Sequence, residues 1–332
     1  MVSFMPKEAF KVTTAIQSKR LQHFPITFLA VPLGFAGFTL ALQKGGEFLF
    51  LPKTVSTVHL WATIALFAIT LSGYLLKAIL YPKEAVSDFN HPIKVNFFPL
   101  VAKVLLVLSV IFLSRNMDVS RYLWFAGAGL QLAASLLIVT QWVDQTHFKL
   151  DHLTPAWFIP IVGNLIVPIA GVAHGYVEIS WFFFSIGIVF WLALFTVVLN
   201  RMIFHHPIME KLMPTLFILF APPAIAFIAY YKLTGEVDAI ARILFYISSF
   251  LFMLILLQAR KLLRIRYFLS WWAYSFPVAA KALSSVLMAH TTHSMFARVS
   301  AQIEIALLAV IVGILVVRTT IEVSRKNICV AE

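Results

Sequence analysis

The sequence predicts an all-α integral membrane protein. Of its 332 residues, 61% are hydrophobic and only 12% are charged, and the mean hydropathy is +0.91. Soluble domains carry about 25% charged residues and roughly 45–50% apolar ones. Apolar stretches of about 20 residues recur along the chain, which indicates membrane-spanning helices rather than the roughly 10-residue alternations of an outer-membrane barrel. The composition excludes a soluble enzyme, a disordered chain and a disulfide scaffold.

Uncharged runs predict ten membrane-spanning helices. The segments are 24–42, 56–80, 95–114, 121–142, 155–173, 179–199, 212–231, 238–258, 268–289 and 297–318. Short connections join them into five helical hairpins, with no room for a separate soluble domain. We therefore expect one transmembrane domain, residues 24–318, between an N-terminal tail of residues 1–23 and a C-terminal tail of residues 319–332.

Proline divides the ten segments into two classes. Every odd-numbered segment contains or begins with proline, and no even-numbered segment contains one. Proline removes a backbone donor and kinks or breaks a helix, and the freed polar groups are tolerated only where protein buries them or where they line a cavity. We therefore expect the odd helices to be interior and the even helices to face lipid. The alternative explanation is the general abundance of proline in membrane helices.

One proline recurs in each odd segment at intervals of 55 to 67 residues, close to the length of one hairpin. The expected kinks are at Pro32, Pro99, Pro160, Pro222 and Pro277. The best internal match aligns Phe98-Pro-Leu-Val-Ala-Lys103 with Phe276-Pro-Val-Ala-Ala-Lys281. Internal repeats place equivalent elements around one axis in channels and transporters. The repeat predicts a quasi-fivefold ring of Pro-kinked inner helices around a central pore, with the even helices outside.

The distribution of Lys and Arg sets the expected orientation. These residues concentrate in the N-terminal tail, in the connections after even segments and in the C-terminal tail, and such an excess marks the cytoplasmic side. We expect both termini in the cytoplasm and the protein in the plasma (cytoplasmic or inner) membrane. The net charge of +12 follows from this topology, so we expect no nucleic-acid partner. The expected partners are the lipid bilayer and small anions. Residues 1–23 lack the apolar core of a secretory signal.

Two lysines lie inside predicted spans. Lys103 and Lys281 each follow the repeat proline by four residues, and Asn164 occupies the same place in the third repeat. A lysine within a span costs about 2.5–3.5 kcal/mol on insertion scales, so it normally faces the protein interior or a wet cavity. We expect the three side chains to line the pore as a mildly positive layer. In the alternative interpretation, each lysine forms an ion pair with an acid such as Glu304, or extends its side chain to the membrane–water interface.

Phenylalanine is abundant, with 31 copies, most of which should pack in the core or face lipid. Five lie beside the repeat prolines: Phe28, Phe98, Phe158, Phe220 and Phe276. Aromatic rings that project toward the axis would form a hydrophobic constriction that gates by steric block and dewetting. These residues are therefore candidates to line the pore.

Other familiar site types are absent from the sequence. The ten histidines lie near span ends or in loops, Cys329 is the only cysteine, and neither a Walker loop nor a GxGxxG segment occurs. Glu304 is the one acid placed properly inside a span, which argues against a proton relay built from Asp and Glu. We expect no metal, no cofactor and no enzymatic activity.

Four segments resemble a known family. Trp271-Trp-Ala-Tyr-Ser-Phe276-Pro277 resembles the ninth-helix motif of the plant guard-cell slow anion channels, and His91-Pro-Ile-Lys-Val-Asn-Phe-Phe98 resembles the entry to their third helix. Phe28-Leu-Ala-Val-Pro-Leu-Gly34 and Pro155-Ala-Trp-Phe-Ile-Pro-Ile-Val-Gly-Asn164 resemble helices 1 and 5 of bacterial TehA-type proteins. The resemblance spans residues 24–318.

The resemblance implies ten helices in five hairpins around a central pore, a homotrimer with one pore per subunit, and passage of chloride and nitrate. It also implies a phenylalanine gate, which falls on Phe276, with Ala30 and Gly34 packed near the ring. The family also includes dicarboxylate and sulfite transporters and proteins named for tellurite resistance. The alternative function is therefore a proton- or gradient-coupled transporter of dicarboxylate, sulfite or tellurite-related oxyanions, in which Glu304 or a lysine would titrate.

Overall fold

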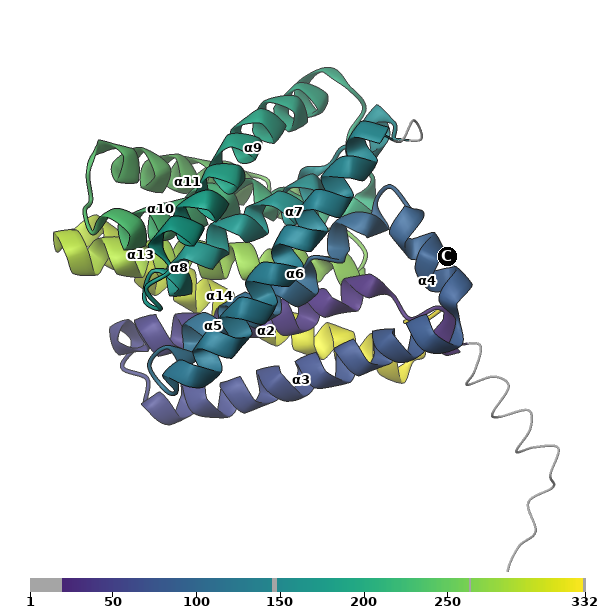
Figure 1. Cartoon of the computed structure of the whole chain (residues 1–332), viewed down its shortest axis with the longest axis horizontal. Coiled ribbons are helices and arrows are strands. Elements are labelled where there is room, and N and C mark those ends of the chain that lie inside the picture. The colour runs from purple at the N-terminus through teal and green to yellow at the C-terminus, as the bar shows by residue number, and fades with distance from the viewer. Residues whose placement is uncertain (1–19, 145–147, 263, 331–332) are drawn as a thin grey trace, which may run out of the picture.

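The structure, a computed structural model, describes residues 20–144, 148–262 and 264–330, and all regular structure within them is helical (Figure 1). Most of the predicted N-terminal tail, residues 1–23, lies outside the described residues. Within these described residues, eight helices are long and apolar enough to cross a membrane: Ile26–Leu49, Lys53–Leu80, Lys94–Phe112, Met117–Asp144, Val177–Phe204, Glu210–Thr234, Ala239–Leu257 and Met295–Ser324. The predicted class, an all-α multi-pass membrane protein, is confirmed.

Each odd segment begins as a 3₁₀-helix and continues as an α-helix. The pairs are η1 (Ile26–Leu29) with α2 (Ala30–Gly45), η3 (Lys94–Phe97) with α5 (Leu100–Phe112), η5 (Pro155–Trp157) with α7 (Phe158–Val162), η7 (Glu210–Phe220) with α10 (Ala221–Thr234), and η8 (Leu269–Tyr274) with α13 (Ser275–Thr292). The repeat proline lies directly before α5 and within the first three residues of the other four α-helices. The N–H groups of a first helical turn have no intrahelical acceptor, so proline starts an α-helix there without losing a bond.

The third odd segment is broken a second time. After α7 the chain forms η6 (Gly163–Ile166) and then α8 (Val167–Gly171), which has Pro168 in its first turn. Pro155–Gly171 is consequently a shorter apolar segment than the eight long helices. The ninth predicted span, 268–289, corresponds to η8 and α13 and carries Lys281. Ten membrane crossings therefore remain a prediction.

The even segments form five long outer helices. They are α3 (Lys53–Leu80), α6 (Met117–Asp144), α9 (Val177–Phe204), α11 (Ala239–Leu257) and α14 (Met295–Ser324). In their most apolar stretches only 28–44% of residues are buried, against 72–100% in Ile26–Leu49, Lys94–Phe112 and Glu210–Thr234. An apolar helix with an exposed side needs an apolar solvent, so the outer helices present their free faces to lipid.

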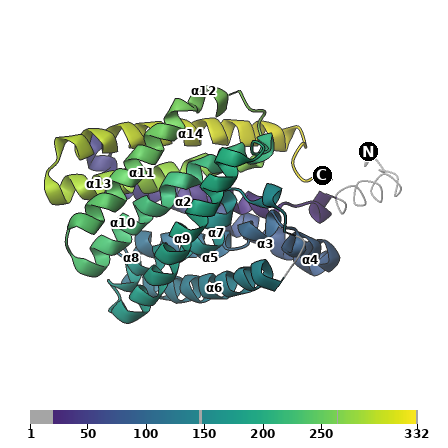
Figure 2. The same ribbon diagram turned by 90° about the horizontal axis from the view of Figure 1, so that it is seen from above.

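The inner segments contact one another in a cyclic order. α2 contacts α5, α5 contacts α8, α8 contacts α10, α10 contacts α13, and α13 contacts α2 again. Each outer helix packs on the inner helix before it in the chain: α3 on α2, α6 on α5, α9 on α8, α11 on α10 and α14 on α13. In the view of Figure 2, α14 and α6 lie on opposite sides of the molecule with α2, α5 and α13 between them.

The two ends of the described chain meet at one end of the molecule. The Arg20 guanidinium donates a hydrogen bond to the Lys326 carbonyl at 2.9 Å, and the yellow C-terminal end lies beside the purple start of the chain (Figures 1 and 2). The same end carries α4 (Pro82–Asn90), a short helix that begins with proline and has Glu84 in its first turn, where an acid complements the helix dipole.

Candidate functional site

Phe276 is the second residue of α13, at the point where the chain leaves η8. Its half-buried ring packs against α2. A Cβ at Gly37 would lie 3.1 Å from Phe276 Cδ2 and 2.9 Å from Ala279 Cβ. The two inner helices therefore approach closely because position 37 carries no side chain.

Gly34 lies one helical turn before Gly37, and its nearest neighbours are Ser275 and Trp272. A Cβ at Gly34 would meet the Ser275 hydroxyl and the Trp272 ring, which belong to the residues just before Phe276. Ala30 is partly buried against the core. The sequence motifs identified Gly34 and missed Gly37, although the two lie three residues apart on one helix face.

The other candidate phenylalanines fall into two groups. Phe158 and Phe220 are fully buried, whereas Phe28 and Phe98 are half-buried. The Phe28 ring stacks on Phe24 with 5.4 Å between ring centroids, and Phe98 meets Tyr74 edge-on at 5.8 Å. The described contacts of all four are with other hydrophobic side chains, so core packing accounts for them, and lining of a pore remains a prediction.

Asn164 is fully buried in η6. Its amide nitrogen donates hydrogen bonds to Ser135 Oγ and to the Ile161 carbonyl, each at 3.0 Å. Its amide oxygen is buried and has no hydrogen-bond partner among the residues that the structure describes. Asn164 therefore joins η6 to the outer helix α6 through Ser135, and its place in a pore lining remains a prediction.

Lys281 pairs with Glu304 of α14. The ammonium lies 3.0 Å from Glu304 Oε1, and the two side chains are 1% and 3% exposed. The ammonium also donates a hydrogen bond to Ser285 Oγ at 2.7 Å and lies 4.6 Å from the centre of the Phe245 ring. This is the ion pair given as the alternative on sequence grounds, and it joins α13 to its outer helix α14.

Lys103 is different, although it occupies the same place in its repeat. The side chain is 4% exposed in α5, and no hydrogen bond or ion pair joins it to the residues that the structure describes. A buried ammonium without a carboxylate costs free energy that must be recovered elsewhere. Unlike Lys281, Lys103 has no carboxylate partner among the described residues, and lining of the pore by either lysine remains a prediction.

A cavity of about 660 Å³ opens where four of the five inner segments begin. We call it the mouth cavity. Its wall includes the starts of η1, η3, η7 and η8, the end of α3, part of α4, and residues 327–330 near the C-terminus. The charged and titratable residues of this wall are Lys77, Lys94, Lys211, Glu84, Asp88, Glu322, His23, His91, Tyr267 and Cys329.

The lysines and carboxylates of the mouth cavity are equal in number, three of each. Burial raises the pKa of the Cys329 thiol and the pKa of the Tyr267 hydroxyl, so both groups stay neutral at pH 7. The mouth cavity is consequently close to charge balance rather than a strongly positive funnel.

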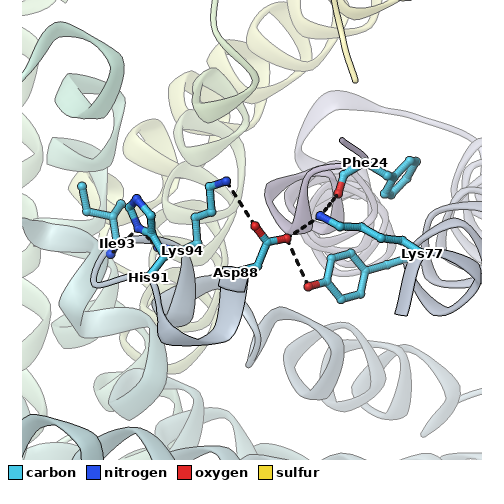
Figure 3. Close-up of polar contacts among 7 residues, drawn as sticks. Phe24, Lys77, Asp88, His91, Ile93 and Lys94 are labelled. Carbon is cyan, nitrogen blue, oxygen red and sulfur yellow. Dashed lines mark hydrogen bonds and ion pairs between the residues drawn. The ribbon is translucent and has the colours of Figure 1, made fainter. Parts of the chain in front are cut away.

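Asp88 of α4 connects two of these lysines (Figure 3). Its Oδ1 accepts a hydrogen bond from Lys94 Nζ at 3.1 Å, and its Oδ2 contacts Lys77 Nζ and lies 3.4 Å from the Tyr74 hydroxyl. Lys77 also donates to the Phe24 carbonyl at 2.9 Å. Lys77 and Asp88 are both buried, and either charge alone would pay a desolvation penalty of several kcal/mol.

His91 fixes the turn that brings Lys94 to Asp88. Its Nδ1 accepts hydrogen bonds from the backbone N–H groups of Ile93 and Lys94, at 3.1 and 3.3 Å (Figure 3). The segment His91-Pro-Ile-Lys94 is therefore a structural turn that orients a lysine of the mouth cavity.

Comparison with known proteins identifies the family. Residues 23–320 match the family model SLAC1, which is described as a voltage-dependent anion channel. The chain belongs to the SLAC1 family. The match covers all five inner segments and all five outer helices almost to the end of α14, and it confirms the resemblance seen in the four sequence motifs.

Relatives in the SLAC1 family come from all three domains of life. An uncharacterized transporter of Methanocaldococcus jannaschii is 29% identical over 81% of this chain and 85% of its own length. The S-type anion channel SLAH2 of Arabidopsis thaliana is 30% identical over 80% of this chain. The tellurite resistance protein TehA homolog of Haemophilus influenzae is 25% identical over 80% of this chain. The match covers 53% of SLAH2 and 48% of the related channel SLAH3, so the chain spans about half the length of these plant relatives.

Proposed function

We propose that this SLAC1-family protein is an anion channel that passes small monovalent anions, such as chloride and nitrate, along a central pathway between α2, α5, α8, α10 and α13. The observation that carries the proposal is the cyclic order of contacts among these inner segments, each backed by its own outer helix. Such an order is what five hairpins around a quasi-fivefold axis require. The family assignment supports anion transport in general.

Phe276 is the proposed gate. It lies at the start of α13, and its ring packs on α2 where Gly37 leaves space for it. A hydrophobic ring at a narrow point blocks anions sterically and by dewetting. Lys103, buried without a partner among the described residues, is the proposed attractive charge of the pathway.

The proposal includes ten crossings, both termini in the cytoplasm and a homotrimer in the plasma (cytoplasmic or inner) membrane. The Arg20–Lys326 hydrogen bond supports an even number of crossings, because it holds the two ends of the described chain together. The excess of Lys and Arg at the predicted cytoplasmic side supports the orientation. The trimer rests on the resemblance alone.

One observation favours the second candidate, a proton- or gradient-coupled transporter of dicarboxylate, sulfite or tellurite-related oxyanions. Glu304 Oε2 is buried and has no hydrogen-bond partner within the described part of the chain, while Oε1 pairs with Lys281. A carboxylate in such a place is a candidate to bind a transported proton. The names of the archaeal and Haemophilus relatives are compatible with this function.

Anion currents through wild-type and Phe276→Ala protein, expressed in the same cells, test the proposal. Chloride is replaced first by nitrate and then by malate. A channel gated at Phe276 gives a much larger current in the variant, with a reversal potential that follows chloride and nitrate. Silence of both proteins, together with pH-dependent malate or sulfite uptake, would support the transporter instead.

A further inference from the structure

We infer that Asp88 determines how tightly the mouth cavity holds an incoming anion. Its carboxylate is a tethered counter-ion, held between Lys77 and Lys94 in the place that a free carboxylate or another oxyanion would occupy. The inference rests on the proposed anion pathway and extends it to a residue that controls anion binding at the entrance.

The groups around Asp88 form a binding site for a carboxylate, and the carboxylate that occupies it is the side chain of Asp88 itself. Each oxygen of the carboxylate contacts a different ammonium, Oδ1 that of Lys94 and Oδ2 that of Lys77. The Tyr74 hydroxyl lies 3.4 Å from Oδ2. Two ammonium groups at the two oxygens of one carboxylate form the arrangement that also binds a free carboxylate through charge-assisted hydrogen bonds.

Exposure shows which part of this site an anion can reach. The Lys94 side chain is 32% exposed, whereas those of Lys77 and Asp88 are 4% and 8% exposed. An anion that enters the mouth cavity therefore meets Lys94 first and competes with Asp88 for its ammonium. Lys77 stays behind Asp88, bound to the Phe24 carbonyl.

The charge balance of the mouth cavity gives Asp88 its effect. The wall holds three lysines and three carboxylates, and among these three described carboxylates Asp88 is the one that contacts two of the lysines. A unit charge about 4 Å from a bound anion changes its affinity about fivefold even at the dielectric constant of water, and more in a partly enclosed site. Conduction requires an anion to enter readily and to leave again, so Asp88 keeps the mouth cavity from trapping anions, above all divalent ones.

Malate block measures this effect directly. In the Phe276→Ala background, malate is applied from the side of the mouth cavity, and the concentration that halves the chloride current is determined. Asp88→Asn is expected to lower this concentration roughly tenfold, because it removes the negative charge that contacts both ammonium groups.

Glu84→Gln is the matched control. Glu84 lines the same cavity and loses the same charge, but its described partner is Gln22, whose amide donates to Oε1 at 2.6 Å. Salt screens a charge that is not in contact with the bound anion, so the control should shift the half-blocking concentration by about twofold or less. Equal shifts in the two variants would overturn the inference, because they would show that malate block depends on the net charge of the cavity and not on the position of Asp88.

Lys94→Gln keeps the buried Lys77–Asp88 pair and serves if Asp88→Asn does not fold. It is expected to raise the half-blocking concentration several-fold, and an unchanged value would overturn the inference.

A binding measurement separates the inference from the proposed function. Malate should raise the apparent Tm of purified Asp88→Asn protein more than that of Glu84→Gln, since a ligand stabilises the state that binds it. If Phe276→Ala carries no current but this difference appears, the channel proposal fails and the anion site stands. If current flows and the two variants respond alike, only the inference fails.

Discussion

Gly37→Ala perturbs the contact between α2 and α13 beside Phe276. The added Cβ would lie 2.9 Å from Ala279 Cβ and 3.1 Å from Phe276 Cδ2. Carbon atoms pack best at about 3.5–4.0 Å, so the two helices must separate by roughly 0.6–1 Å. The Ala279 methyl is fixed to its helix and cannot rotate away. Overpacking of this kind typically costs about 1–3 kcal/mol.

Thermal unfolding of purified protein measures the cost, and Gly129→Ala is the matched control. Gly129 lies in the outer helix α6, where an added Cβ would have no described neighbour within 4 Å apart from the adjacent backbone of its own helix. Alanine is favoured over glycine inside a helix by about 0.8–1.0 kcal/mol, so the control should match or exceed wild-type stability. Gly37→Ala should unfold at a lower temperature than both. Displacement of the ring should also raise the anion current above wild type, though less than Phe276→Ala does.

Two results would refute this reasoning in different ways. An apparent Tm equal to that of Gly129→Ala would mean that α2 and α13 are not tightly packed at this position. A lower Tm with an unchanged current would keep the packing but remove Gly37 from any role in the gate.

Three further predictions concern charges. Glu304→Ala leaves Lys281 buried without its carboxylate and should destabilise the protein by about 3–5 kcal/mol; thermal unfolding should also show recovery when Lys281→Met is added. Lys103→Ala should lower the chloride current of Phe276→Ala about fivefold at low salt, and an unchanged current would exclude the lysine from the pathway. The Ala241 N–H and the Tyr230 hydroxyl donate to Asp238 and hold its pKa below its usual range. The ionised Asp238 carboxylate therefore stabilises the folded protein above about pH 4, and this stabilisation is lost as the pH falls through the lowered pKa. Wild type should therefore lose more stability on acidification than Asp238→Asn, and equal losses in a thermal unfolding series would contradict this.

The helical class and most segment positions were predictable because their signals are local. Runs of apolar residues define the spans, and the repeat prolines stand where 3₁₀-helix changes to α-helix. The second break in the third segment has Pro168 as a local signal, but the hydrogen-bond partners beside it are distant in the sequence. Gln131 and Ser135 of α6 both donate hydrogen bonds to the Pro160 carbonyl, at 2.6 and 3.0 Å, and so satisfy a backbone group that the break leaves free. No local pattern in 155–173 reveals these two partners.

The site was less predictable, because its residues are joined across helices. Lys103 and Lys281 have the same offset from their prolines, yet Lys281 has Glu304 within 3.0 Å and Lys103 has no described partner. Asp88 gave no signal at all, since its role depends on the fold of α4 against the end of α3. A sequence motif can locate a charged residue, but the tertiary structure determines which residue of opposite charge lies beside it.

The reversal potential of purified Phe276→Ala protein, reconstituted alone in a lipid bilayer under a chloride gradient, tests the central claim most directly. A channel predicts a large current that reverses near the chloride equilibrium potential, shifts when nitrate replaces chloride, and does not depend on a proton gradient. Electrically silent bilayers, with saturable anion uptake that requires a proton gradient, would contradict the channel and assign the chemistry to Glu304 and Lys281.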